Sequence, residues 1–434
     1  MIDAIALPHG ATLRVERVDG ARSFSAGFWF PVGSRHETSR ERGFVHFIEH
    51  LLFKGTTSRS AEDIARSVDR VGGYLNAFTE RDTLCVHCTV PSRHWRLAFD
   101  ILADLCFRAT FPPEEVERER EVIVNEILAA LDDPEEMSHD LMLERIWPGD
   151  PLSLPIAGTE KDVRAAARGD LVSFRDRMLR PELLLVTAAG PMAGNDIATY
   201  LSDILGKLSV GPTTGAFEIN FPEPGFKSLV GHVRASISQA HLLVSAPLHP
   251  PFEPKDYYAL SVLNGAFGES MSSRLFQRLR EREGLCYAVA SGFSMGRTEG
   301  LWVAQASSSP KDFPALLASM LGEMDDIRGP RPLSNEELSE SISRVEGSYD
   351  LALEDTEFRM KRMARQAMQA GEVLDAEETR ARILGVDRAS VSRMTERVFG
   401  SGERSIFAYG NLGPRGTKAL ATIDGGKARR SGSA

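Results

Sequence analysis

Cysteine is scarce in this chain, with 4 residues among 434. So few cysteines in so long a chain indicate a reducing compartment, and we expect a cytoplasmic protein. The first residues contain no basic segment followed by an apolar core, so no signal peptide is predicted. No apolar run approaches the length needed to cross a bilayer, which excludes a membrane as partner.

Positive charge is also in the minority. Lys and Arg number 51 against 61 Asp and Glu, for a formal net charge of −10. No basic stripe with interleaved aromatic residues is present, which argues against nucleic acid as a partner. The hydrophobic content of 42% is that of a globular protein with a packed core. Because 434 residues are too many for one ordinary core, we expect at least two domains.

The rest of the chain is organised around residues 43–55, Gly-Phe-Val-His-Phe-Ile-Glu-His-Leu-Leu-Phe-Lys-Gly. At helical spacing His46 and His50 lie one turn apart on one face with Glu49 beside them, and the other face is apolar. Two such imidazoles can hold one zinc ion, and the carboxylate can take a proton from an attacking water. His-x-x-Glu-His is the inverzincin order. The alternative for so short a pattern is an ordinary surface helix, and the flanking sequence decides between the two.

An acidic segment follows at residues 117–127, Glu-Arg-Glu-Arg-Glu-Val-Ile-Val-Asn-Glu-Ile. Within it Glu119 and Glu126 are two helical turns apart and therefore share a face. Together with the His-x-x-Glu-His helix and the Phe-Lys-Gly-Thr run at 53–56, this segment resembles the pitrilysin family. Insulin-degrading enzyme and mitochondrial processing peptidase belong to that family.

The resemblance implies a role for each of these polar residues. His46, His50 and Glu126 would bind zinc, one ion per chain. Glu49 would be the general base of a metallopeptidase. Glu119 would orient a ligand histidine, as a carboxylate hydrogen-bonded to an imidazole does in many zinc sites. A solvated charged face is the alternative for Glu119.

The second half of the chain repeats the plan of the first. Residues 174–190 and 394–410 each read as an amphipathic helix, a short polar turn, a strand and a glycine. Residues 60–90 likewise match residues 272–303. Strands and helices mix, with long helices between paired strands, which favours an α+β fold.

The family resemblance implies two homologous α/β modules, each a mixed, mainly antiparallel sheet packed with helices. We expect the zinc module at residues 1–212 and its homologue at residues 213–415. The boundary is predicted near residues 211–215, where small and helix-breaking residues cluster. Residues 416–434 are rich in Gly, Lys, Arg and Ser without apolar periodicity, and we expect a disordered tail.

Residues 72–79, Gly-Gly-Tyr-Leu-Asn-Ala-Phe-Thr, match the family's edge strand, which pairs with the substrate backbone. The resemblance makes Asn76 and Ala77 candidate substrate contacts. Backbone pairing of this kind holds an extended peptide with little regard for its sequence. An ordinary turn and strand is the alternative for this segment.

Residues 273–287 resemble the Arg/Tyr motif of the same family. By spacing the pair is Arg280 and Tyr287, with Arg278 and Arg282 as alternatives for the arginine. A cation and a phenol near the scissile bond can hold a peptide carbonyl and stabilise the developing oxyanion. Without the resemblance, the segment reads as a basic surface helix followed by a core tyrosine.

The repeat gives the Arg/Tyr motif a place in the second module. Gly284 aligns with Gly73, which sets Tyr287 opposite Asn76. If equivalent segments approach one peptide, the module without a zinc motif still supplies catalytic groups.

Taken together, the sequence predicts a zinc metalloendopeptidase that hydrolyses unfolded or short peptides. The resemblance implies a chamber of four modules, so a two-module chain would act as a homodimer or as a heterodimer with a related subunit. One alternative is a dedicated peptide-maturation subunit working with a related partner. A non-catalytic scaffold subunit is another, although the intact motifs argue for an active enzyme.

Overall fold

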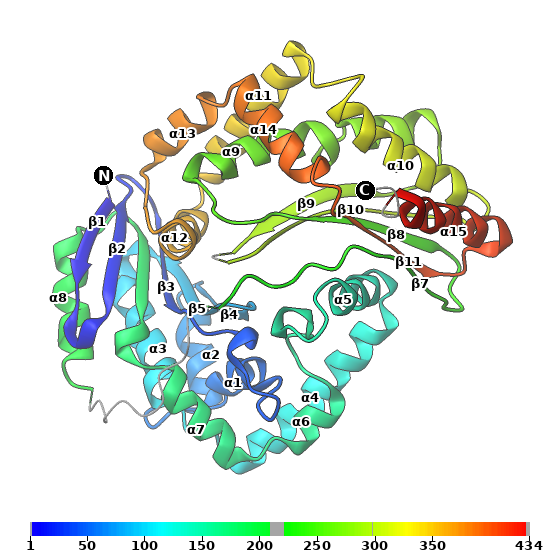
Figure 1. Ribbon diagram of the computed structural model, residues 1–434. Helices are drawn as coiled ribbons and strands as arrows, with labels where there is room; N and C mark the ends of the chain where they lie inside the picture. Colours follow the sequence, from blue (N-terminus) through cyan, green and yellow to red (C-terminus); the bar gives the residue numbers. More distant parts are fainter. Residues whose placement is uncertain (1, 209–220, 297, 431–434) are drawn as a thin grey trace. The chain divides into compact units, whose positions relative to one another are not determined.

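The chain forms two compact units, each assembled from three stretches of sequence (Figure 1). The computed structural model describes residues 2–208, 221–296 and 298–430. Unit 1 consists of Met1–Ala129, Leu154–Phe221 and Asp350–Glu377, and unit 2 of Ala130–Ser153, Pro222–Tyr349 and Glu378–Ala434. The expected boundary near residue 212 lies outside the described residues. Unit 1 includes residues 350–377 from the second half of the chain, and unit 2 includes residues 130–153 from the first half. The predicted modules at 1–212 and 213–415 are contiguous and contain no such exchange.

Unit 1 is built on a six-stranded sheet in the order β1-β2-β6-β3-β5-β4. The strands are β1 (Ile2–Ala6), β2 (Thr12–Arg17), β3 (Ser23–Phe30), β4 (Tyr74–Thr79), β5 (Leu84–Pro91) and β6 (Leu185–Gly190). β2 and β6 pair in parallel, and the other neighbours are antiparallel. The central strand β3 is buried along nearly its whole length, so its apolar residues face packed layers on both sides.

Helices cover one face of this sheet and form the larger core of unit 1. They are α1 (Phe44–Leu52), α2 (Ala61–Asp69), α3 (Trp95–Arg108), α4 (Pro113–Asp132), α6 (Glu160–Ala165), α7 (Arg168–Met178) and α8 (Gly194–Leu205). The predicted zinc helix corresponds to α1, and Ser60 caps α2 by accepting from the backbone N–H of Asp63. In the described part of the chain, no helix is both long and apolar enough to cross a membrane.

The opposite face of the sheet is covered by α12 (Thr356–Arg365), which comes from the second half of the chain (Figure 1). Met360 packs beside Trp29 in a small separate core. A Cβ atom on Gly27 would lie 2.6 Å from the Met360 sulfur, so glycine is needed for this close approach. The buried Glu16 carboxylate pairs with Arg362 at 2.7 Å. The sequence pattern of residues 356–365 does not indicate that this helix packs on the sheet of the first half.

Unit 2 repeats the plan with a five-stranded sheet in the order β7-β11-β8-β10-β9. Its strands are β7 (Val230–Val233), β8 (Ala240–Pro247), β9 (Val289–Met295), β10 (Gly300–Ser308) and β11 (Ser405–Gly410). β7 and β11 are parallel and the other neighbours antiparallel, so the order matches that of unit 1 without β1. The predicted α+β fold of two homologous, mainly antiparallel modules is confirmed.

The helices of unit 2 include one from the first half of the chain. They are α5 (Pro134–Ile146), α9 (Pro254–Asn264), α10 (Phe313–Arg328), α11 (Asn335–Ala352), α13 (Ala376–Leu384), α14 (Arg388–Phe399) and α15 (Gly413–Arg430). α5 packs on β8 and β11, where Met142 and Ile146 share a core with Leu243 and Phe407. The two halves therefore exchange a helix reciprocally.

The predicted equivalence of Tyr287 and Asn76 is wrong. Thr79 pairs with Leu84 at the closed end of the β4–β5 hairpin, as Met295 pairs with Gly300 in β9–β10. When the two hairpins are aligned on these pairs, Tyr287 lies before the start of β9. The equivalent position in unit 1 lies before the start of β4, and Asn76 lies within β4. The reason is a longer connection after the second helix, because Gly73 directly precedes β4 whereas several residues separate Gly284 from β9.

The predicted disordered tail is also wrong for the residues described. Residues 416–430 belong to α15, which packs against α10 and β7. Leu420 is buried, and a Cβ atom on Gly416 would lie 3.1 Å from Phe313. Gly416 and Leu420 lie one helical turn apart with Thr417 and Lys418 between them, a pattern too sparse to mark a helix in the sequence.

Candidate metal centre

α1 has one buried and one half-buried face. Phe47, Ile48 and Leu51 are buried in the core of unit 1, and the half-buried His46 and His50 lie on the other face. Because the apolar side fixes the helix against the sheet, the imidazoles are held on its remaining side.

The N-terminus of α1 is capped from outside the helix. Gly43 stands at the cap position and has no side chain, so the Glu37 carboxyl accepts from the backbone N–H groups of Gly43 and Val45, both at 2.8 Å. These bonds satisfy two amides that have no partner inside the helix. Burial raises the pKa of Glu37 to about 8, against the lowering effect of the same amides. The role of Glu37 was not predicted from the sequence.

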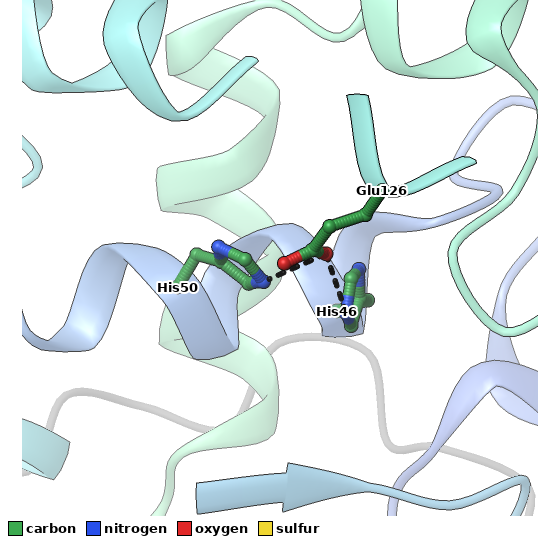
Figure 2. A group of neighbouring side chains, drawn as sticks. All are labelled: His46, His50 and Glu126. Atoms are coloured by element: carbon green, nitrogen blue, oxygen red, sulfur yellow. Dashed lines mark ion pairs between the residues drawn. The ribbon is translucent and has the colours of Figure 1, made fainter. Parts of the chain in front are cut away.

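His46 and His50 of α1 and Glu126 of α4 point toward one another (Figure 2). Their Nε2 atoms lie 3.8 and 3.4 Å from Oε2 of Glu126. One ligand atom from each residue lies within 4.8 Å of the others, and no other group of this kind occurs among the described residues. Donors at about 2.0–2.2 Å from a tetrahedral zinc ion are themselves about 3.3–3.6 Å apart. His50 and Glu126 have this separation and His46 is slightly further from Glu126, so a small side-chain movement would complete a zinc site.

The surroundings of His46 favour its neutral form, which is the form that binds a metal. Burial, and to a lesser extent the neighbouring His50, lowers the pKa of His46 to about 4. Its imidazole is therefore neutral at physiological pH, with a nitrogen lone pair available for coordination.

Glu119 lies behind His50, as expected for a residue that orients a ligand. Its Oε2 is 3.1 Å from His50 Nδ1, which leaves Nε2 of the same ring directed at Glu126. Glu119 is almost fully buried, and its second oxygen is 2.7 Å from Nζ of Lys54. Lys54 balances this buried charge and was not predicted as part of the site.

Glu49 is held by a residue of the neighbouring strand. Its Oε2 accepts a hydrogen bond from the hydroxyl of Thr79 at the end of β4. Burial raises the pKa of Glu49, while the Thr79 hydroxyl and His50 act in the opposite direction and Glu126 adds to the rise. Thr79 lies in the segment that matches the family's edge strand, but no role for it was predicted from the sequence.

β4 lies at the edge of its sheet, next to α1, as expected for the predicted substrate strand. Asn76 is exposed, and its amide nitrogen donates to the hydroxyl of Tyr74 at 2.7 Å. Ala77 is buried on the opposite face of the strand. The roles of Asn76 and Ala77 toward substrate stay predictions.

The hydrogen-bond pattern shows which backbone groups of this edge are open. The N–H of Glu80 donates to the carbonyl of Thr83 at 2.7 Å, so this is a hydrogen-bonded pair of the β4–β5 ladder. In an antiparallel ladder such pairs alternate with pairs whose backbone groups point away. Ala77 and Thr79 fall in the second class and direct their N–H and C=O groups to the open side, whereas those of Asn76 face β5.

Arg280 and Tyr287 belong to unit 2. Arg280, in the π-helical segment η7 (Phe276–Arg282), stacks between two rings, 4.7 Å from the centroid of Phe276 and 4.9 Å from that of Tyr287. Tyr287 is 80% exposed. Arg278 instead pairs with Glu283 and Glu323, each at 2.9 Å. This distinction favours Arg280 over Arg278 as the arginine of the predicted pair.

In unit 2 the counterpart of α1 is the end of α9 with the π-helical turn η6 (Gly265–Glu269), and it has no metal ligands. Asn264 accepts there from Ser291 Oγ at 2.7 Å and from the indole of Trp302 at 3.2 Å. Arg344 pairs with Glu269 at 3.1 Å, and its guanidinium occupies the space where a Cβ atom on Gly265 would lie. A polar network and an ion pair therefore fill this position.

Two sheets of matching strand order and one His₂Glu donor set are the features of a two-module metallopeptidase. Residues 15–160 match the Insulinase (Peptidase family M16) model, and residues 166–345 match the Peptidase M16 inactive domain. The chain belongs to the M16 peptidase family, which confirms the pitrilysin-type resemblance.

Relatives and solved structures agree with this assignment. An uncharacterized zinc protease of Streptomyces coelicolor is 32% identical over 399 residues, covering 91% of this chain and 86% of the relative. One of Bacillus subtilis is 30% identical over 403 residues, covering 92% and 96%. A peptidase M16 inactive domain from Pseudomonas fluorescens has the same fold, with a TM-score of 0.85 at 16% identity, over 94% of this chain and 98% of that one. A protease from Helicobacter pylori has a TM-score of 0.85 at 17% identity, over 94% and 99%.

The ligand set predicts a graded loss of zinc affinity. Glu119→Gln should weaken zinc binding about 10–100-fold, because it removes a carboxylate that orients His50. Glu126→Gln should weaken it further, because a charged ligand itself is lost. Competition with a chelator measures both, and Glu121→Gln, an exposed position of the same helix, is the matched control. Undiminished affinity in Glu126→Gln would contradict the ligand assignment.

The buried Glu37 predicts a pH dependence of stability. Its folded-state pKa of about 8 lies above the ordinary value of 4.5, so between these values the folded state keeps a proton that the unfolded state releases. The contribution of Glu37 to the free energy of unfolding should therefore fall as pH rises from 5 to 8. Burial lowers the pKa values of His46 and His87 to about 4, and these groups contribute in the opposite direction below pH 6.5. In urea unfolding at several pH values, the free energy of unfolding of Glu37→Gln should therefore fall less, or rise more, with pH than that of wild type. An equal dependence of the free energy of unfolding on pH in wild type and Glu37→Gln would show that Glu37 does not have a raised pKa in the folded state.

Proposed function

We propose that this protein is a zinc endopeptidase that hydrolyses unfolded or short peptides. The observation that carries the proposal is the convergence of His46, His50 and Glu126 beside Glu49, next to the open edge of β4. A three-ligand donor set with a neighbouring carboxylate is the arrangement of a hydrolytic zinc site, which keeps a fourth position for water or substrate.

The chemistry divides between the metal and the protein. Zinc held by the three ligands would activate a water and polarise the scissile carbonyl. Glu49 accepts the proton of the attacking water and passes it to the nitrogen of the leaving amine. Burial raises the pKa of Glu49 above its ordinary value, which is the direction in which enzymes shift a carboxylate for general acid–base catalysis.

The substrate class follows from the edge strand. The open N–H and C=O groups of Ala77 and Thr79 offer a place for an extended chain to pair as a further strand. Asn76 would contact that chain through its side chain. A folded protein has its strands already paired, so the substrates would be flexible peptides.

We assign Arg280 and Tyr287 to the same reaction. An exposed phenol can donate to a developing oxyanion, and the stacked guanidinium can hold a substrate carbonyl. The working assembly would be a dimer, with a second copy or with a related subunit. A dedicated peptide-maturation role is compatible with the same site, whereas the complete donor set disfavours a non-catalytic scaffold.

The direct test of the proposal is Glu49→Gln. This variant should keep its zinc but lose about a hundred- to ten-thousand-fold in turnover, because a general base is removed and no ligand changes. Cleavage of a mixed peptide library, read by mass spectrometry with and without chelator, measures the loss. Glu62→Gln, an exposed position on α2, should behave as wild type. Hydrolysis at the wild-type rate by Glu49→Gln would refute the mechanism.

Tyr287→Phe tests the contribution of unit 2. Loss of one oxyanion donor typically costs about a hundred- to thousand-fold in kcat. Zinc content and folding should not change, since the Tyr287 side chain is exposed and lies outside the ligand set. Tyr257→Phe, at another partly exposed tyrosine of the unit, is the matched control. Equal kcat values for Tyr287→Phe and wild type would mean that this phenol takes no part in catalysis.

A further inference from the structure

Thr79 occupies a position shared by the base and the substrate strand. Side chains alternate along β4, so Thr79 lies on the same face as Ala77, toward α1. Its hydroxyl donates to Oε2 of Glu49. Its backbone groups, in contrast, point to the open edge of the sheet. One residue therefore contacts the base through its side chain and offers its main chain to a paired peptide.

The direction of the hydrogen bond is fixed by chemistry. An ionised carboxylate only accepts, so the Thr79 hydroxyl must be the donor and Glu49 Oε2 the acceptor. A glutamate side chain rotates about three bonds, and a general base must lie within about 2.6–3.2 Å of the proton that it takes. A hydrogen bond from a strand, whose backbone is held by the sheet, restricts this rotation.

We infer that Thr79 is a positioning residue for Glu49, and this inference rests on the proposed peptidase function. With Oε2 occupied by the Thr79 hydroxyl, Oε1 is the oxygen that takes the proton from the attacking water. The same Oε1–H bond then breaks as the proton passes to the amine nitrogen of the leaving peptide. Oε2 stays an acceptor throughout, so the transferred proton is carried by Oε1 alone.

The same geometry links substrate pairing to the base. A peptide paired to the open N–H and C=O of Thr79 fixes the end of β4 further, and the hydroxyl of that residue fixes the carboxylate. Displacement of a reacting group by about 1 Å can cost a hundredfold in rate. The effect of Thr79 is therefore expected in kcat rather than in KM.

The test compares Thr79→Val with Thr79→Ser. Valine keeps the branched shape and the backbone groups but has no donor, so kcat should fall about ten- to hundredfold with KM little changed. Serine keeps the hydroxyl and should restore kcat to within a few-fold of wild type. Thr12→Val, at an exposed position in the same sheet, is the matched control and should leave both constants unchanged.

A second readout does not depend on turnover. In crystals of metal-free protein, Glu49 should leave its wild-type position or take several rotamers in Thr79→Val, and should keep one rotamer in Thr79→Ser. Zinc content should be equal in all variants, because no ligand has changed.

The outcomes separate the inference from the proposed function. Wild-type kcat in Thr79→Val, with Glu49→Gln inactive, would overturn the positioning role and leave the peptidase function standing. Equal losses in the valine and serine variants would also overturn it, because the hydroxyl would then be irrelevant. A wild-type protein that binds zinc but cleaves no peptide would overturn the proposed function and the inference with it.

Discussion

The burial of one face of α1 is the constraint on which the rest of the site depends. A helix of nine residues has to place its apolar side in the core and hold two imidazoles on the other side. Its short length gives it little stability of its own, so it is fixed by its neighbours. Glu37 caps its N-terminus, Glu119 holds His50, and Thr79 holds Glu49. Each contact comes from a different element, so the geometry of the centre is a property of the whole unit.

The two units share a fold but differ at the helix that carries the histidines in unit 1. In unit 1 the carboxylates of Glu119 and Glu126 approach the histidines. Lys54 pairs with Glu119, and a zinc ion would balance the charge of Glu126. In unit 2 the corresponding turn is occupied by the Arg344–Glu269 ion pair and by the polar network around Asn264. The turn of unit 2 that corresponds to the zinc helix is therefore filled by protein side chains, the Arg344 guanidinium among them. The difference accounts for a chain with two similar modules and a single donor set among the residues described.

Much of the centre could be predicted from the sequence, because spacing within one helix determines which residues share a face. His46 and His50 follow from that rule alone. Glu126 followed only from the family resemblance, since no local pattern says which distant helix will cross α1. The contacts of Glu37 and Thr79 depend on tertiary packing and could not be predicted. For the same reason the exchange of α5 and α12 between units could not be predicted. The alignment of the two halves by a constant offset failed at Tyr287, because the connection before β9 is longer than the one before β4.

X-ray absorption at the zinc edge tests the central claim most directly, because it reports the donor atoms themselves. We expect a shell of nitrogen and oxygen at about 2.0–2.2 Å with no sulfur at about 2.3 Å. The spectrum of Glu126→Gln should differ from that of wild type, while that of Glu49→Gln should not. A sulfur shell, or identical spectra for wild type and Glu126→Gln, would contradict a centre built from His46, His50 and Glu126.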